Sequence, residues 1–478
     1  MSGSAMSDPA ELARLLPKGF IVGAATAAFQ IEGAVAEDGR TPSTWDEFTA
    51  RRDRDGHGTI LDASDASIAA DHYHRYRDDV ALMKDLGLDA YRFSLSWTRI
   101  QPHGRGAGNP AGIAFYDRLL DELLAADIAP MATLFHWDTP LELEQRGGWR
   151  RRETALRFAE FAAIAGEAFG DRVDSWITIN EAATVTLEGY ALDLHAPGLG
   201  SSLSVIPVAR HLLLAHGLAV EALRAVPVAG RIGITNVHSP AVPASDSSRD
   251  RTAAAFFDFL HNRLFADPVL LGRTARVPAG TGLLGLGLRA LNRTSRADLA
   301  TTSTPLDFYG LNYYFPSRVA AGAAPAGTGT PDGTSEAMDS APFHLTEWPQ
   351  YDQTGFGWPI APEYLRVALT EMVERYGEKL PPIVITEGGA SFVDAVADDG
   401  EVADDERVAY LASHLAVAAE GVPGADVRGY FVWSLLDNFE WAAGYTQRFG
   451  LVHVDFATLL RTPKRSFHWL QQVLKARS

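Results

Sequence analysis

The sequence predicts a single-domain α/β protein built as a (β/α)8 TIM barrel, a closed ring of parallel strands surrounded by helices. Two observations carry this prediction: apolar runs of strand length alternate with amphipathic stretches, and polar side chains gather where the apolar runs end. Near-continuous apolar strands that alternate with amphipathic helices are typical of a parallel sheet covered on its outer face. The chain has 478 residues, and α/β barrels with insertions reach this size as one unit.

The expected elements follow one another with a loose strand-helix period. Eight strands are expected at residues 20–26, 90–97, 129–137, 175–181, 231–238, 306–314, 382–388 and 427–435. Helical periodicity is clear at residues 73–86, 113–126, 153–169, 206–225, 362–376 and 404–420. Long segments at 40–66, 320–340 and 394–404 are rich in small and polar residues, so we expect them to wall the barrel mouth at its carboxyl-end face.

The chain is divided into an N-terminal extension, residues 1–16, and a barrel domain, residues 17–478. Within the extension, Met6 is a candidate natural start, and residues 2–5 have the small-residue composition of a cloning remnant. Asp8 and Glu11 stand where a signal peptide would be cationic and then apolar. No segment is expected to supply the roughly 20 apolar residues of a membrane span. A cytoplasmic location is therefore expected.

The composition narrows the classes of function. Lys and Arg total 42 against 60 Asp and Glu, a formal net charge of −18. This balance disfavours nucleic acids and anionic membranes as partners and fits a neutral small-molecule substrate. The absence of cysteine excludes disulfides, thiolate chemistry and Cys-ligated zinc. His72 and His74 lie two residues apart at a helix start and are interpreted as surface or capping residues, so neither a metal nor a cofactor is expected. The oligomeric state is left open.

Polar side chains stand at or just after the carboxyl ends of the expected strands, where the reactive groups of such barrels collect. They are Gln30 and Glu32 after the first strand, Arg92 in the second, His136 and Asp138 in and after the third, Asn180 and Glu181 in the fourth, Asn312 and Tyr314 in the sixth, and Glu387 in the seventh. Glu181 and Glu387 each end an apolar run, and only a large closed fold could bring them together. A pair of carboxyl groups is what cleavage of a glycosidic bond requires.

Seven motifs in order resemble glycoside hydrolase family 1, and specifically its β-glucosidases, from about residue 20 to 469. The motifs lie at residues 29–33, 91–97, 135–138, 178–181, 310–314, 385–388 and 438–445. The resemblance implies a retaining exo-β-glycosidase, with Glu181 as acid/base and Glu387 as nucleophile of a double displacement. Terminal non-reducing β-D-glucosides are the expected substrates, and galactosides and fucosides stay open.

The same resemblance assigns supporting roles. Hydrogen bonds to sugar hydroxyls are implied for Gln30, His136, Asn180 and Glu440. Trp433 and Trp441 are expected to offer flat apolar faces to the sugar, and Trp358 to wall the aglycone site. Arg92 is expected beside Glu387, Tyr314 is expected to position Glu387 through its hydroxyl, and Asn312 is counted among the supporting residues.

Physical reasoning gives the two glutamates different protonation states. A nucleophilic carboxylate reaches the anomeric carbon only if the carboxyl groups are about 5 to 5.5 Å apart. Two charges at that distance repel by roughly 3 kcal/mol at an effective dielectric constant of ~20, or about 2 pKa units. One carboxyl is therefore expected to stay protonated near neutral pH. Glu181 is the expected proton holder, since Arg92 favours the ionised form of Glu387.

The chain departs from the family pattern at three positions. Ala182 and Gly388 stand where the family usually has proline and asparagine, and Pro359 stands where glutamate commonly follows the tryptophan. We expect these changes to alter the rate or the aglycone preference. Glu440 and Trp441 favour unphosphorylated glycosides over the 6-phospho-β-glycosidase alternative. Transglycosylation and a catalytically inactive sugar-binding barrel remain alternatives.

Overall fold

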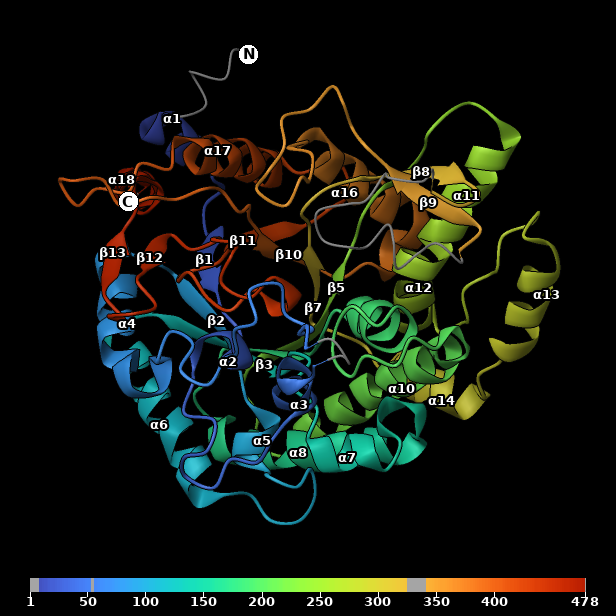
Figure 1. Cartoon of the computed structure of the whole chain (residues 1–478), viewed down its shortest axis with the longest axis horizontal. Coiled ribbons are helices and arrows are strands. Elements are labelled where there is room, and N and C mark those ends of the chain that lie inside the picture. The colour runs from blue at the N-terminus through green and yellow to red at the C-terminus, as the bar shows by residue number, and fades with distance from the viewer. Residues whose placement is uncertain (1–7, 53–55, 325–340, 478) are drawn as a thin grey trace.

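The computed structural model, which describes residues 8–52, 56–324 and 341–477, contains a closed barrel of eight parallel strands (Figure 1). The strand order round the barrel is β1-β11-β10-β7-β5-β4-β3-β2. The bounds are β1 Ile21–Ala25, β2 Ala90–Ser94, β3 Ala129–Phe135, β4 Ser175–Asn180, β5 Arg231–Val237, β7 Phe308–Asn312, β10 Ile383–Gly388 and β11 Val427–Trp433. Each strand lies within one of the eight expected runs, so the predicted fold class is confirmed.

Helices cover the outside of the barrel, as Figure 1 shows. The six expected helices are α4 His72–Leu86, α6 Pro110–Ala125, α8 Arg152–Phe169, α10 Val205–Arg224, α16 Glu363–Tyr376 and α17 Asp405–Glu420. Further helices are α11 Ser248–Asp258, α12 Leu264–Leu271, α13 Gly282–Leu291, α14 Arg296–Thr302 and α18 Arg465–Arg477. Local sequence sets the ends of the expected helices: Asn109 caps α6 ahead of Pro110, and Gly87 ends α4 with φ 83°.

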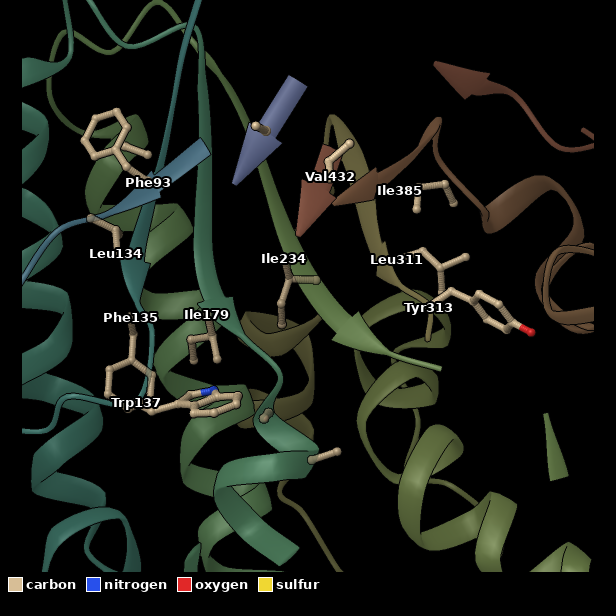
Figure 2. Packing of buried hydrophobic residues seen from close by; sticks show 14 of the residues in the cluster. Phe93, Leu134, Phe135, Trp137, Ile179, Ile234, Leu311, Tyr313, Ile385 and Val432 are labelled. Atoms are coloured by element: carbon tan, nitrogen blue, oxygen red, sulfur yellow. The ribbon is translucent and has the colours of Figure 1, made fainter. Parts of the chain in front are cut away.

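The strands are buried on both faces. Side chains that include Ala90, Met131, Ile177, Val384 and Phe431 come from strands all round the barrel and pack in its interior. A larger cluster fills the space between the strands and the helices. Figure 2 shows members of this second cluster on successive strands: Phe93, Leu134, Ile179, Ile234, Leu311, Ile385 and Val432. Burial of both faces explains why the sequence shows near-continuous apolar runs.

The two strands that lead to the glutamates are irregular beside them. The register of β10 against β7 shifts between Ile385 and Glu387, and that of β4 against β5 shifts between Ile177 and Asn180. Such bulges re-aim side chains and are over-represented next to active sites. The irregularities therefore help to aim both carboxyl groups into the barrel mouth.

Extra elements follow the carboxyl ends of the strands. A three-stranded sheet contains β6 Ala241–Pro243, β8 Ser317–Ala321 and β9 Phe343–Thr346, which come after β5 and β7. The segment 40–66 contains α3 Thr44–Ala50, which begins with a capping box between Ser43 and Asp46. Most of the segment 320–340 lies outside the described residues.

Two expectations about individual segments were wrong. The helical stretch Ser202–Arg224 is long and apolar enough to cross a membrane, although no such segment was expected. Most of it is buried in the structure, where α10 packs against α8, so its composition is that of a core helix. His72 is buried, not exposed, and its Nδ1 lies 2.8 Å from Oδ2 of Asp79.

The described part of the N-terminal extension is packed. Helix α1, Pro9–Leu15, begins at Asp8, whose side chain accepts a hydrogen bond from Ala10 N. Leu12 and Leu16 are buried, and α1 contacts α17 and α18 at the end of the chain. From Asp8 onward the extension therefore shares the core of the barrel domain.

Candidate active site

Glu181 and Glu387 both lie buried at the carboxyl-end face, with side chains only a few per cent exposed. Glu387 is the fifth residue of β10, whereas Glu181 directly follows β4. Glu181 adopts the left-handed conformation, with φ 48°, and its N–H donates to the Thr235 carbonyl at 2.9 Å. A left-handed non-glycine residue is strained, and such strain clusters at functional sites. The sharp turn separates β4 from α9, Ala182–Thr184.

Glu387 is held by two donors. Arg92 Nη1 donates to its Oε1, and the hydroxyl of Tyr314 donates to its Oε2 at 2.6 Å. The Arg92 guanidinium is itself buried, and its Nε donates to Thr133 Oγ1 at 3.2 Å. A buried cation and a phenol both favour the ionised carboxylate. The structure thus places Arg92 and Tyr314 against Glu387, as the sequence led us to expect.

Glu181 has a different environment. Asn312 Nδ2 donates to its Oε1 at 2.7 Å, and Thr184 Oγ1 donates to its Oε2 at 2.8 Å. Burial, and after it the negative charge of Glu387, raises the pKa of Glu181 to about 7, against the opposing effect of these two hydrogen bonds. Glu181 therefore holds its proton up to about neutral pH. Thr184 was not singled out in the sequence, where only its spacing of three from Glu181 marks it.

Asn180 links the two halves of the site. Its Oδ1 accepts hydrogen bonds from Arg92 Nη2 at 2.7 Å and from Asn312 Nδ2 at 3.1 Å. Its Nδ2 lies 3.2 Å from His136 Nε2. Burial and the charge of Arg92 hold the pKa of His136 well below its usual range, so its Nε2 accepts and its Nδ1 carries the proton. That Nδ1 is buried and has no partner among the described residues.

A second polar group lies at the end of β11. Gln30 Nε2 donates to Asn438 Oδ1 and to the Phe439 carbonyl, both at 2.9 Å, and lies 3.5 Å from Glu440 Oε2. Gln30 Oε1 is buried without a partner among the described residues. Burial, and next the charge of Glu387, raises the pKa of Glu440 to about 8. Asn438 was not named individually in the sequence, although it opens the motif at 438–445.

Aromatic rings flank these polar groups. The His136 ring stacks on Trp433 at 5.8 Å and on Trp441 at 5.9 Å between centroids. Trp358 packs against Tyr314, with 5.6 Å between the two ring centroids. The Trp358 ring also stacks on Phe356, with 4.7 Å between centroids. The structure therefore brings together all of the site residues expected from the sequence in two linked groups, and Trp358 joins them through Tyr314.

The residues after Glu387 are closely packed. A Cβ at Gly388 would lie 2.2 Å from the Tyr430 hydroxyl, and a Cβ at Gly389 would lie 1.8 Å from the Trp433 carbonyl oxygen. The space beside Gly388 is therefore limited by Tyr430 of the neighbouring strand β11. Because glycine has no Cβ, Gly388 and Gly389 let the end of β10 approach β11 closely.

The arrangement suits acid/base and nucleophilic chemistry on a neutral polyhydroxylated ligand. It offers Glu387 paired with a buried guanidinium, two carboxyl groups whose pKa values are raised to about 7 and about 8, and aromatic faces within one buried site. In the described ranges, no three or more His, Asp or Glu side chains gather so that they could hold a metal ion.

Known proteins are similar to this chain in sequence and architecture. The sequence profile of glycosyl hydrolase family 1 matches residues 12–478. β-Glucosidase A of Acetivibrio thermocellus is 40% identical over 460 residues, 96% of this chain and 98% of that protein. A bifunctional β-D-glucosidase/β-D-fucosidase of Bifidobacterium breve is 39% identical over 96% of this chain and 98% of its own length.

A solved structure agrees with these sequence matches. The psychrophilic β-glucosidase of Micrococcus antarcticus superposes with a TM-score of 0.88 at 43% identity, over 98% of this chain and 99% of that one. Profile, relatives and architecture extend over nearly the whole chain. The chain is a member of glycosyl hydrolase family 1.

Proposed function

We propose that the protein is a retaining exo-β-glucosidase that releases terminal non-reducing β-D-glucosyl residues, with Glu387 as nucleophile and Glu181 as acid/base. The observation that carries the proposal is the contrast between the two carboxyl groups. Glu387 receives hydrogen bonds from Arg92 and Tyr314, whereas the pKa of Glu181 is raised to about 7. One group is thus ready to attack while the other is ready to donate a proton.

In the first half-reaction, a Glu387 oxygen forms a bond to C1 as the bond from C1 to the aglycone oxygen breaks. The proton of Glu181 passes to that oxygen, and the aglycone leaves as an alcohol. Esterification removes the charge of Glu387, which is the second-largest cause of the raised pKa of Glu181. The pKa of Glu181 is therefore lower in the glycosyl-enzyme than in the free enzyme, so Glu181 stays ionised at neutral pH.

In the second half-reaction, Glu181 takes a proton from water as the water oxygen attacks C1. The bond between C1 and Glu387 breaks, Glu387 regains its negative charge, and glucose leaves with the β configuration. Two inversions at C1 give retention. Another alcohol in place of water would give transglycosylation by the same steps.

Sugar recognition follows from the free polar atoms. The Nδ1–H of His136 can donate to a hydroxyl, and the Oε1 of Gln30 can accept from one. Glu440 adds a carboxyl group whose pKa of about 8 keeps it largely neutral at pH 7. A 6-phosphate would meet the Glu440 carboxyl instead of a cation, which favours unphosphorylated sugars. The Bifidobacterium breve relative supports tolerance of fucosides.

An aryl-glycoside panel with added azide tests the proposal. We expect Glu181→Ala to give β-glucosyl azide and Glu387→Ala to give α-glucosyl azide, because azide enters from the face that the missing carboxyl leaves open. Glu347→Ala, at an exposed position, is the matched control and should keep wild-type turnover. Exclusive turnover of 6-phosphoglucosides, labelling of another residue by a fluorosugar, or sugar binding without turnover would each overturn the proposal. A cytoplasmic location stays a prediction that fractionation of the native cells tests.

A further inference from the structure

Thr184 lies against the carboxyl group proposed as acid/base. It ends the short helix α9 that follows Glu181, and its side chain is buried. Its Oγ1 is 2.8 Å from Glu181 Oε2, while Asn312 Nδ2 is 2.7 Å from Oε1. Each oxygen of the carboxyl group therefore has one partner of its own.

The orientation of Asn312 is fixed by its neighbours. Arg92 can only donate, so the Asn180 atom facing it at 2.7 Å is the oxygen. The Asn312 atom 3.1 Å from that oxygen must then be its nitrogen, and the hydroxyl of Thr386 donates to Asn312 Oδ1 at 2.8 Å. Asn312 thus presents a nitrogen, which only donates, to Glu181 Oε1.

This geometry distinguishes the two oxygens of Glu181 as positions for its proton. Oε1 faces an amide nitrogen that only donates, so a proton there would have to point away from Asn312. Oε2 faces the Thr184 hydroxyl, which can accept, so a proton on Oε2 has an acceptor among the described residues. A hydroxyl both donates and accepts, so Thr184 can accept from protonated Oε2 and donate to ionised Oε2 by rotating about one bond.

We propose that Thr184 is a positioning residue whose hydroxyl reverses its hydrogen bond to Glu181 Oε2 between the two half-reactions, and so keeps the carboxyl group aimed in both protonation states. The inference rests on the proposed role of Glu181. Asn312 cannot do this, because its amide nitrogen favours only the ionised form. Thr184 is thus the group that leaves Oε2 free to hold the transferable proton.

Other charged and titratable groups also act on Glu181. Glu387 on β10 raises its pKa and Arg92 on β2 lowers it. Glu440 after β11 and Tyr314 after β7 feel the charge of Glu181 in turn. None of them changes when Thr184 is replaced, so a shift of the pH profile in a Thr184 variant reports the hydroxyl itself.

Thr184→Val removes the hydroxyl and keeps the shape, and Thr184→Ser keeps the hydroxyl. The lost donor stabilised ionised Glu181, so we expect Thr184→Val to move the alkaline limb of kcat/KM upward by about half to one pH unit. Thr184→Ser should restore the wild-type limb. Thr186→Val is the matched control, because Thr186 is buried two residues away and its Oγ1 has no partner within the described part of the chain.

A dinitrophenyl β-glucoside gives a second readout, because its leaving group needs no acid and the second half-reaction then limits kcat. In that step Glu181 must be ionised, so Thr184→Val should lower kcat at pH 6 roughly threefold to tenfold, with recovery at higher pH. A loss of activity that is equal at every pH, with both limbs unmoved, would show a merely structural role. If Thr184→Val does not fold, Thr184→Ala is measured in the same way.

Glu181→Ala, measured beside these variants, separates the two proposals. If it keeps full activity on poor leaving groups, the proposed function fails. If it loses that activity while Thr184→Val shifts neither limb, only the inference about Thr184 fails.

Discussion

Asn312 and Glu181 are joined by a 2.7 Å hydrogen bond from the amide nitrogen to Oε1. The same nitrogen lies 3.1 Å from Asn180 Oδ1, so one side chain on β7 orients both a proposed acid/base group and a proposed sugar ligand. This double contact makes Asn312 a positioning residue for Glu181 and Asn180. It also connects Glu181, through Asn180, to Arg92 and Glu387.

Asn312→Ala should lower kcat/KM for aryl β-glucosides by about 10- to 100-fold, because two oriented groups lose a donor at once. The loss of a bond to ionised Glu181 should also move the alkaline limb of the pH profile upward. Steady-state kinetics from pH 5 to 9 measure both effects. Asn292→Ala, at the end of α13, is the control, because its Nδ2 donates to the Ala275 carbonyl at 3.0 Å and not to a site residue. Unchanged kinetics in Asn312→Ala would contradict the assignment.

The wild-type enzyme should lose kcat/KM above about pH 7, where the pKa of Glu181 lies. The loss reflects deprotonation of the acid needed to expel the aglycone. A substrate whose leaving group needs no protonation should therefore show a much weaker alkaline loss. Equal alkaline losses for nitrophenyl and poor alkyl leaving groups would show that another group controls this limb.

Glu181 should also make stability depend on pH. Its pKa is about 7 in the folded chain against a reference of 4.5, so the folded state binds the proton more tightly. The free energy of unfolding therefore falls as pH rises from about 4.5 to 7, by roughly 3 kcal/mol for this group.

Glu181→Gln removes that cost, since a neutral amide can accept from Asn312 and donate to the Thr184 hydroxyl. Denaturant titrations should show the variant to be more stable than wild type at pH 8 and equal to it at pH 4.5. A gain of the same size at both pH values would mean that packing, and not ionisation, explains it.

Tyr314→Phe removes the 2.6 Å hydrogen bond to Glu387 Oε2 and keeps the ring against Trp358. We expect kcat to fall about 10- to 100-fold with little change in the free energy of unfolding, because the nucleophile loses orientation and not its fold. Stopped-flow measurement with a dinitrophenyl substrate locates the affected step. Tyr351→Phe, whose hydroxyl contacts Glu363 away from the site, should behave like wild type.

The strands and the six long helices could be predicted because burial imposes a repeating pattern on them. Arg92 and Glu387 could be placed together because both lie in barrel strands and the resemblance to the family implied their contact. Thr184 could not be found in this way, since its contact depends on the left-handed turn at Glu181. The burial of His72 depends on Asp79, a pairing between side chains that no periodicity reveals.

Packing between strands and between helices was also not predicted from the sequence. Gly388 was noted only as a departure from the family pattern, but its environment is set by Tyr430 on the neighbouring strand. The apolar composition of α10 is a local feature that was underestimated. The local pattern does not contain the packing partner, α8, against which this helix is buried.

Gly389→Ala should be strongly destabilising, because the new Cβ would lie 1.8 Å from the Trp433 carbonyl oxygen and backbone atoms cannot rotate away. Separation of β10 from β11 would displace both Glu387 and Trp433. We therefore expect the free energy of unfolding to fall by more than about 3 kcal/mol and any folded fraction to have little activity. Gly287→Ala is the matched control: no atom lies within 4 Å of its added Cβ, and alanine is the better helix former in α13. Denaturant titration and soluble yield measure both variants. If Gly389→Ala were as stable as Gly287→Ala, β11 could not be packed against the residues that follow Glu387, and the positioning of the nucleophile by that strand would have to be abandoned.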